Sequence, residues 1–322
     1  MQQKTKDAYI KLAANFYKTR FSENEDLTAH SVSKKLIECA ADYRPAYWRR
    51  LRNALEHDQK RRGFDKAADK IKKLKNPLTT EGVIKQNPAV KPKQKRVKSV
   101  SIDEHQLIMQ NIKDDRPLAA ALYISNLLGC RPAELGGLEL NNDGVTIIGV
   151  KKSTELKRGL DRKILLEAQQ VRLIANAIMI LRREQNKKEG GDWVHRLQRR
   201  LDTVTKSTFP KRKSQITLYS YRHQKGSDLK ASAMDRVSIA YLMGHQSTNS
   251  VDSYGNRKTG SGRAILKPCS EGLAAAQSVI RGNHRLPPNS ATPTPIAPTP
   301  TPAPTAAEST AQKSSFLQGL GL

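Results

Sequence analysis

A short basic segment divides this chain and limits what each side of it can fold into. Residues 87–98 hold two prolines, Pro88 and Pro92, and five lysines or arginines, with no acidic residue among them. Proline interrupts a helix, and like charges keep a chain extended. We therefore expect a basic interdomain linker at 89–98, which separates a first domain at 1–88 from a second domain that begins at residue 99.

The two sides of this linker carry different hydrophobic patterns. Upstream, apolar side chains recur near a 3.6-residue period, as Tyr9, Leu12 and Phe16 do, and this predicts helices. Downstream, two short apolar or β-branched runs at 144–150 and 162–166 predict strands beside a charged turn. The fold class we expect is mainly α with a small antiparallel β-sheet (α+β). Downstream helices are predicted from Ser101 and at 118–128, 167–189, 193–206, 222–231, 236–243 and 262–281.

The end of the chain has a composition that cannot build a core. Between Pro287 and Pro304 proline alternates mainly with threonine and alanine, and the stretch is almost uncharged. Such a sequence buries too little apolar surface to offset the entropy lost on ordering, and it favours an extended polyproline conformation. We predict a disordered Pro/Thr-rich tail at 285–322, which leaves 99–284 as the second domain.

The excess of basic side chains indicates the class of partner. The chain has 57 Lys plus Arg against 30 Asp plus Glu, a formal net charge of +27 at pH 7. A surplus of this size favours a polyanionic partner, of which nucleic acid is the commonest. Charge alone leaves open an enzyme that acts on acidic substrates and a protein of membrane surfaces.

Several other classes of protein are disfavoured by simple sequence features. The longest apolar runs, such as Leu118–Cys130, are too short and too polar to span a bilayer. The first residues lack the apolar core of a signal peptide. The three cysteines, Cys39, Cys130 and Cys269, lie far apart and outside any metal-binding spacing. We expect a cytoplasmic protein with reduced cysteines, no metal site and no cofactor.

Four short motifs carry side chains suited to phosphoryl chemistry, and their order matters more than any one of them. Alone, each has an ordinary structural explanation, such as an arginine at a helix junction, a helix-ending Gly-His or a half-buried tyrosine. The motifs are the segments 129–135, 218–223, 241–245 and 247–254, which hold Arg131, Arg222, His245 and Tyr254 respectively.

Together these motifs resemble the signature of the tyrosine recombinase (phage integrase-type) family, which runs Arg, Lys, His-x-x-Arg, His or Trp, and Tyr. Gly129–Glu134 corresponds to the first box, Arg222 to the second arginine, and Leu242–His245 to the LGH-like box. The intervals, 245 − 222 = 23 and 254 − 245 = 9 residues, are typical of the family. The resemblance covers about residues 99–266. It implies a tyrosine-recombinase catalytic domain, preceded by a helical core-binding domain that clamps DNA.

The resemblance also implies a role for each of these side chains. Tyr254 would attack a DNA phosphorus and form a 3′-phosphotyrosyl bond. Arg131 and Arg222 would bind the non-bridging oxygens, because a planar guanidinium forks onto them as an ammonium does not. His245 would add a third donor, and Glu134 would support Arg131 from behind. No divalent cation is required for this chemistry.

The position of the family's catalytic lysine is matched less directly. The family places it in a β-hairpin between the two arginines, before a small or hydroxylated residue. Lys152 follows the predicted strand at 144–150 and precedes Ser153, so it fits best; Lys151 is the second candidate. This lysine would protonate the departing 5′-oxygen.

One position departs from the family pattern. Where the family has the histidine of His-x-x-Arg, this chain has Tyr219. A phenol donates a hydrogen bond but is a poor base near neutral pH, with an ordinary pKa of about 10. Either Tyr254 therefore loses its proton with little help, or His223 or His245 assists.

Basic residues outside the motifs are predicted to contact the DNA backbone. A solvated helix face is the usual explanation of a charge run, and a disordered spacer would share the composition of the linker. A basic strap between two domains nevertheless suits a protein that follows a phosphate backbone. The predicted DNA-binding residues are Lys60, Arg61, Arg62, Lys72, Lys73, Lys91, Lys93, Lys95, Arg96 and Lys98.

The function that the resemblance implies is site-specific recombination. The protein would be the integrase or transposition recombinase of a mobile element, cytoplasmic and nucleoid-associated, with no membrane partner. It would bind double-stranded DNA recombination sites, assemble on them as a dimer and tetramer, and exchange strands through a Holliday junction, with room for an accessory directionality protein. Two alternatives remain open: a non-catalytic DNA-binding regulator on the recombinase scaffold, and a type IB topoisomerase-like enzyme.

Overall fold

The chain forms two compact units, Met1–Lys95 and Arg96–Leu322. The division falls inside the segment that the sequence predicts as the linker, and each unit has a hydrophobic core of its own. Lys93, Lys151 and the predicted tail at 285–322 lie outside the described residues. The computed structural model describes residues 3–23, 25–79, 89–92, 95–112, 114–150, 152, 159–187, 192–261 and 266–282.

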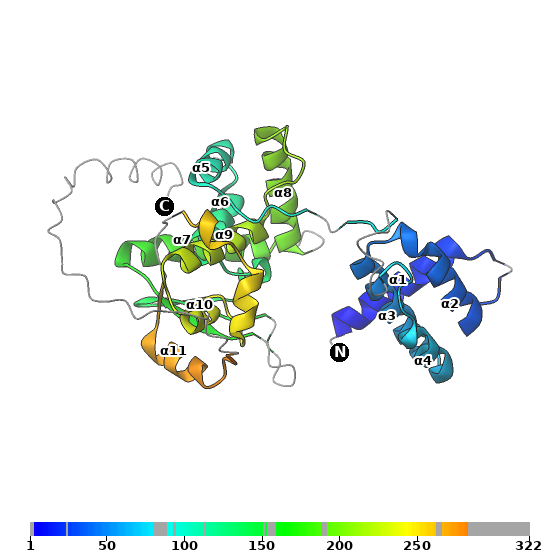
Figure 1. Cartoon of the computed structure of the whole chain (residues 1–322). Helices are drawn as coiled ribbons and strands as arrows, with labels where there is room; N and C mark the ends of the chain where they lie inside the picture. Colours follow the sequence, from blue (N-terminus) through cyan, green and yellow to red (C-terminus); the bar gives the residue numbers. More distant parts are fainter. Residues whose placement is uncertain are drawn as a thin grey trace. The chain divides into compact units, whose positions relative to one another are not determined.

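The first unit is helical throughout its described elements. Its core joins the apolar faces of these helices and includes Phe16, Leu36, Trp48 and Leu55. The indole Nε1 of Trp48 also donates to the Leu36 carbonyl at 2.8 Å, so the largest core side chain leaves no polar atom unpaired. The helices are α1 (Gln3–Arg20), α2 (Ala29–Glu38), α3 (Pro45–Arg61) and α4 (Asp65–Lys73), with a 3-10 turn η1 (Cys39–Asp42) (Figure 1).

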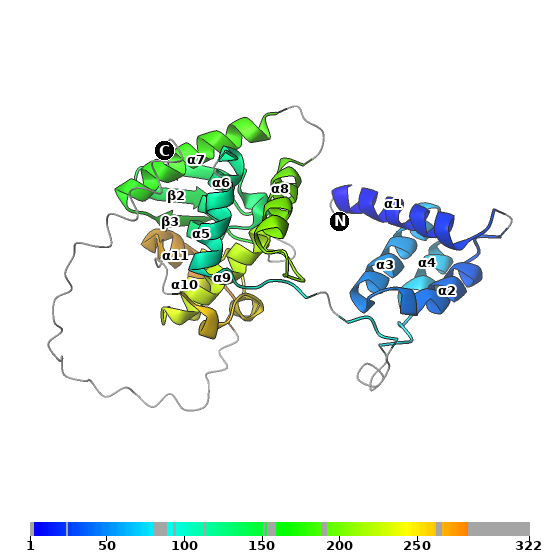
Figure 2. The same cartoon turned by 90° about the horizontal axis from the view of Figure 1, so that it is seen from above.

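The second unit is built around one central helix, α6. Its sequence is apolar on nearly every side, and it packs against α7, α8 and α9 (Figure 2). No helix in the described part of the chain is both long enough and apolar enough to cross a membrane. The helices are α5 (Ile102–Asn111), α6 (Arg116–Leu128), α7 (Ala168–Gln185), α8 (Trp193–Thr208), α9 (Leu218–Ala231), α10 (Arg236–Leu242) and α11 (Ser270–Gln277).

A small antiparallel sheet lies beside these helices. Its strands are β1 (Leu138–Asn141), β2 (Gly144–Ile147), β3 (Arg162–Leu165) and β4 (Lys267–Pro268), in the order β1-β2-β3-β4. The register pairs Val145 with Ile164, and both are buried, as expected of alternating strand side chains. The mainly α fold with a small antiparallel sheet is therefore the fold class that the sequence predicts.

Two helix predictions in the second unit need correction. The helix predicted from residue 222 begins four residues earlier, because Thr217 caps it by accepting a hydrogen bond from the Ser220 N–H at 3.2 Å. The single helix predicted at 262–281 is wrong: strand β4 and the shorter α11 lie there instead. Pro268 disfavours helical geometry at the residue before it and removes a backbone donor, so it suits a short edge strand.

Candidate active site

Arg131 is held by the sharp turn that ends α6. Gly129 has a φ of +61°, in the left-handed region that favours glycine, and a Cβ there would lie 2.5 Å from the Lys225 side chain. The chain then forms a short 3-10 turn, η2 (Pro132–Glu134). The Arg131 side chain is 11% exposed and donates to the Gly244 carbonyl at 3.2 Å.

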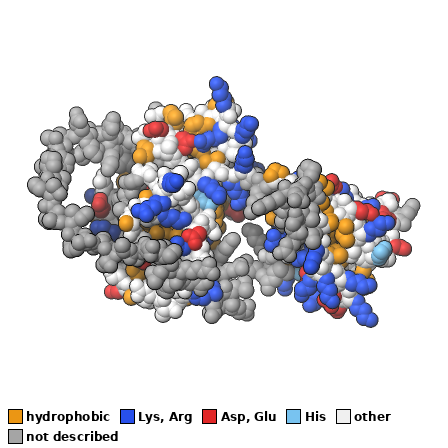
Figure 3. Space-filling view, viewed as in Figure 1, with side chains coloured by type: hydrophobic (Ala, Val, Ile, Leu, Met, Phe, Trp, Pro, Cys, Tyr) orange, Lys and Arg blue, Asp and Glu red, His pale blue; other side chains and the backbone are white. Residues whose placement is uncertain are grey.

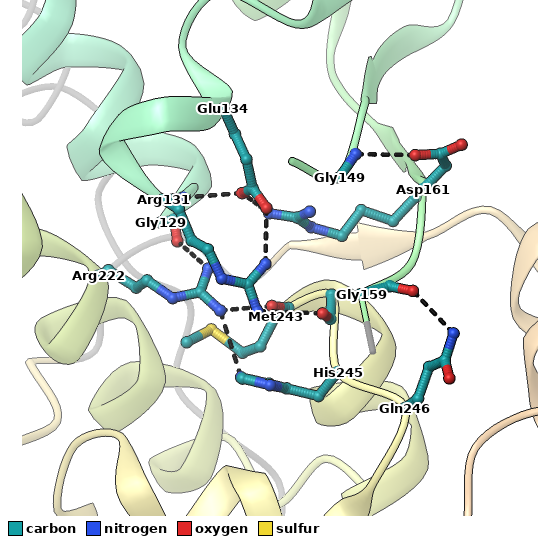
Figure 4. A network of polar contacts seen from close by, with 12 residues as sticks. Gly129, Arg131, Glu134, Gly149, Gly159, Asp161, Arg222, Met243, His245 and Gln246 are labelled. Atoms are coloured by element: carbon teal, nitrogen blue, oxygen red, sulfur yellow. Dashed lines mark hydrogen bonds and ion pairs between the residues drawn. The ribbon is translucent and has the colours of Figure 1, made fainter. Parts of the chain in front are cut away.

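A buried glutamate joins two arginines behind this turn (Figure 4). Glu134 accepts from Arg131 Nη1 at 2.6 Å and from Arg162 Nη2 at 2.8 Å. Burial alone would raise the pKa of this carboxyl, but Arg162 and then Arg131 outweigh it and lower the pKa to about 2. Arg162 is buried in β3 and donates from Nε to the Leu242 carbonyl at 2.8 Å. The ion pairs therefore tie the first motif to the sheet, and the hydrogen bonds of Arg131 and Arg162 to backbone carbonyls tie both to the third motif.

Arg222 is fixed on α9 by carbonyls of the first and third motifs (Figure 4). Its Nη1 donates to the Gly129 carbonyl at 2.9 Å, and its Nη2 donates to the Met243 carbonyl. The side chain is fully buried, and its Nε has no hydrogen-bond partner among the described residues. Burial, then the charges of Arg131 and Arg162, lower the pKa of Arg222 to about 10, so the guanidinium stays charged at neutral pH.

His245 is a neutral neighbour of Arg222. Arg222 Nη2 lies 3.2 Å from His245 Nε2, and because arginine has no acceptor, this nitrogen accepts and the ring proton is on Nδ1. Burial, then the charges of Arg222 and Arg131, lower the pKa of His245 to about 3. At neutral pH the ring is therefore uncharged, and Nδ1–H is its remaining donor.

Tyr254 lies against the Arg222 guanidinium at the end of the 3-10 turn η3 (Thr248–Ser253). The Arg222 Cζ is 4.8 Å from the centre of the Tyr254 ring, and Tyr254 Oη is 2.8 Å from Tyr219 Oη. Burial raises the pKa of Tyr254, but the Tyr219 hydrogen bond and the Arg222 charge outweigh it, so the pKa lies below its ordinary value. Burial raises the pKa of Tyr219 to about 12. When Tyr254 is ionised, Tyr219 therefore keeps its proton and donates a hydrogen bond to the Tyr254 oxygen.

His223 packs on the Tyr254 ring, with 5.1 Å between the ring centres. Its Nδ1 accepts from the Gly255 N–H at 3.4 Å, which leaves the ring proton on Nε2. Burial, then the charges of Lys98 and Arg222, lower the pKa of His223 to about 4. Both histidines beside Tyr254 are therefore neutral, and in each the acceptor nitrogen is already engaged by an N–H donor.

The arrangement of helices and sheet around these side chains has counterparts in solved structures. No family model matches the chain, and no curated protein does. A lambda integrase tetramer bound to a Holliday junction is 15% identical, with a TM-score of 0.51 over 82% of this chain and 75% of that chain. A lambda integrase dimer bound to a COC′ core site is also 15% identical, with a TM-score of 0.50 over 83% and 75%. The chain has the tyrosine recombinase fold.

The predicted general acid of this recombinase fold lies on the hairpin rather than in the buried cluster. The Lys152 side chain is 50% exposed, and its Nζ donates to Asp161 Oδ2 at 2.8 Å. Asp161 Oδ1 in turn accepts from the Gly149 N–H at 2.7 Å (Figure 4). Within the described residues, which leave out 151 and 153–158, no hydrogen bond or ion pair joins Lys152 to the side chains of the four motifs, Arg131, Arg222, His245 and Tyr254.

The far end of the hairpin is nevertheless tied to the third motif. Gln246 follows His245 in the sequence, and its Nε2 donates to the Gly159 carbonyl at 2.8 Å (Figure 4). A shift of the hairpin would therefore be transmitted to the segment that holds the histidine.

The predicted DNA-backbone residues fall in both units. Arg61 and Arg62 pair with the buried carboxylate of Asp58 at 2.9 and 2.8 Å, which offsets part of their charge. Their contact with DNA remains a prediction, as it does for the whole set. The other described members are exposed: Lys60, Lys72, Lys73, Lys91, Lys95, Arg96 and Lys98.

Sequence reasoning does not identify Arg162, although a signal for it exists. Strand side chains alternate between faces, and Arg162 shares the buried face of β3 with Ile164. A charge at an inward strand position requires a partner, here Glu134. The carbonyls of Gly129 and Met243 carry no such signal, because every residue supplies a carbonyl. Among the described residues, no group of three His, Cys, Asp or Glu side chains could hold a metal ion.

Proposed function

We propose that this chain is a site-specific DNA recombinase that cuts and rejoins DNA through a 3′-phosphotyrosyl intermediate. The observation that carries the proposal is the contact of Tyr254 with the Arg222 guanidinium, with His245 at 5.0 Å between ring centres. Transfer at a phosphodiester requires a nucleophile, neutralisation of the developing charge and a proton for the leaving oxygen. The buried cluster offers the first two of these.

The nucleophile of this reaction is the Tyr254 phenolate. Its oxygen attacks phosphorus, the bond from phosphorus to the 5′-oxygen breaks, and Lys152 gives the departing 5′-oxygen its proton. Because the acceptor nitrogens of His223 and His245 are engaged, the Tyr254 proton goes to solvent, with the phenolate favoured by Arg222 and Tyr219. A 5′-hydroxyl of the partner strand later attacks the phosphotyrosine and restores Tyr254.

The two arginines of the motifs neutralise the phosphate. Arg131 is partly exposed, so its guanidinium can reach the non-bridging oxygens. Arg222 is buried beside the Tyr254 ring and adds its positive charge at the nucleophile. Backbone carbonyls and Glu134 hold both guanidiniums before DNA arrives. Donors that are oriented in advance do not have to reorganise during the reaction, which is where electrostatic catalysis is most effective.

The biological setting we propose is the integration or transposition of a mobile element. A lambda integrase tetramer bound to a Holliday junction shares the fold, which supports assembly of this chain as a dimer and tetramer on double-stranded sites. The exposed lysines of the first unit and the linker would supply contacts to the backbone that do not depend on sequence.

The test is covalent capture on a DNA duplex that is nicked beside the scissile phosphate, so that the cut strand diffuses away. Duplexes are selected from a random pool by the wild-type protein. We expect a protein–DNA adduct that survives denaturation with the wild type and none with Tyr254→Phe. An adduct with Tyr254→Phe would exclude this nucleophile. DNA binding without any adduct would favour the regulator, and relaxation of supercoiled plasmid by a monomer would favour the topoisomerase.

A further inference from the structure

A basic pocket lies outside the cluster of side chains that the proposed reaction uses. Its cavity volume is about 410 Å³. Its basic lining side chains come from three separate parts of the second unit, namely the end of the linker, the end of α9 and the 3-10 turn η4 (Arg257–Thr259). The lining has no acidic residue and consists of Lys98, Ser99, Lys230, Gly255, Asn256, Arg257 and Thr259.

One wall of this pocket is the backbone that continues from the proposed nucleophile. Gly255 follows Tyr254 at a φ of +64°, and a Cβ there would come within 2.3 Å of the Ser227 nitrogen. The Lys230 ammonium donates to the Gly255 carbonyl at 3.2 Å, and the Asn256 N–H donates to Ser227 Oγ at 2.9 Å. The wall is therefore pinned to α9, and whatever binds in the pocket acts on the segment that carries Tyr254.

The positive charges of this region are concentrated rather than dispersed. Lys98 and Lys230 both lie close enough to His223 to help lower its pKa, after the larger effect of burial. Burial also lowers the pKa of Lys230, and the nearby carboxylate of Asp252 opposes this effect. That carboxylate is paired with Arg236 at 2.8 Å. Lys and Arg side chains gather on the face of the second unit seen in Figure 3. Concentrated positive charge of this kind favours a bound anion.

We propose that this pocket seats one phosphodiester group of the DNA backbone, distinct from the phosphate that Tyr254 attacks. Lys230 and Arg257 bind its non-bridging oxygens from opposite elements, and Lys98 adds a third charge from the linker. The seat fixes the backbone at Gly255 against the DNA and so sets the position of the nucleophile relative to its target. This inference rests on the proposed function, since DNA supplies the phosphate.

The salt dependence of DNA binding tests whether Lys230 and Arg257 share one phosphate. The affinity of the full chain for an arbitrary 30-base-pair duplex is measured against salt for Lys230→Gln, Arg257→Gln and the double variant. Removing one phosphate from the set that the protein neutralises lowers the slope by about one unit. A shared seat predicts that the double variant lowers the slope by about one. A reduction of about two, or none, would overturn the proposal.

Lys258→Gln is the matched control. Lys258 is the neighbour of Arg257 in η4 and is exposed, but it does not line the pocket. Its effect on the slope, whatever its size, is expected to add to that of Lys230→Gln. Failure to add would mean that the whole turn acts as one unspecific patch, which also contradicts a defined seat.

A titration distinguishes a DNA phosphate from a free phosphate. The amide resonances of Gly255 and Asn256 in the full chain are followed with the duplex and, separately, with inorganic phosphate. The duplex is expected to shift them at a lower concentration of phosphate groups, and a stronger response to inorganic phosphate would overturn DNA as the source. Loss of the seat and loss of the proposed function remain distinguishable. If the adduct forms but the double variant of Lys230 and Arg257 lowers the slope by about two, only the phosphate site in the pocket is contradicted. If the double variant lowers the slope by about one but no adduct forms, only the proposed catalysis is contradicted.

Discussion

The two cationic regions of the candidate site are built in opposite ways. Arg162 and Arg222 are buried and bound by backbone carbonyls or by Glu134. Lys152 is half exposed, and it pairs with Asp161, which is 43% exposed itself. A cation that stabilises the charge of the phosphate acts best when its position is fixed before DNA binds. A group that delivers a proton acts best when it can move and can exchange protons with solvent. The difference therefore matches the roles we propose.

This contrast also determines which interactions the fold depends on. Breaking a buried ion pair leaves an uncompensated charge in a medium of low dielectric, whereas an exposed pair exchanges its partner for water. Substitutions in the buried region should therefore affect both folding and chemistry, and substitutions on the hairpin should change the free energy of unfolding little.

Arg222→Lys should have the largest effect. The lysine keeps the charge but cannot bond the Gly129 and Met243 carbonyls and a phosphate at once. We expect adduct formation on the nicked duplex to fall by about 10³-fold, as when a donor to a developing anion is removed. The Kd for DNA should change by only a few-fold, because many other contacts hold the backbone. Arg236→Lys, at an exposed ion pair, serves as the control. A parallel loss of binding would contradict the role of Arg222.

Glu134→Gln should have the next largest effect, on stability. It removes the carboxylate that neutralises the buried Arg162, and we expect the free energy of unfolding of the second unit to fall by about 3 kcal/mol in urea denaturation. Asp202→Asn, which breaks an exposed pair with Lys206, should leave the transition unchanged.

The pH dependence of unfolding gives a second measure of the same pair. The pKa of Glu134 is about 2 in the folded chain against a reference of 4.5. The folded state therefore binds fewer protons than the unfolded state between these values, so stability is present above pH 4.5 and is lost as the pH falls toward 2. The free energy of unfolding should therefore fall less steeply with decreasing pH in Glu134→Gln than in the wild type. Equal slopes would mean that folding does not lower the pKa of Glu134.

The sequence anticipates the side chains of this site better than their supports. Arg131, Arg222 and Tyr254, which the structure brings close together, could be predicted because the order and spacing of the motifs are encoded along the chain. Arg162 is missed because its partner lies 28 residues away, and period-two alternation over four strand residues is a weak signal. Strand β4 is missed because its two residues are too few to show any period, and pairing with β3 alone defines it.

Tyr219→Phe should have a smaller effect, of about tenfold. It removes the hydrogen bond to the Tyr254 oxygen, and a hydrogen bond to a charged group contributes about 1.5 kcal/mol. The pKa of Tyr254 should rise, so that less phenolate is present at a given pH and the pH–rate profile of adduct formation moves toward alkaline pH. Tyr219→His, which restores the residue of the family pattern, should recover the rate. An unchanged profile would show that Arg222 alone lowers the pKa.

Asp161→Asn should have the smallest effect and tests the exposed region directly. The amide keeps an acceptor for the Gly149 N–H but loses the charge that pairs with Lys152. Because solvent screens this pair, the free energy of unfolding should fall by no more than about 1 kcal/mol. A loss of stability as large as that of Glu134→Gln would mean that the hairpin is a structural part of the site, and the proton donor would then have to be as fixed as the arginines.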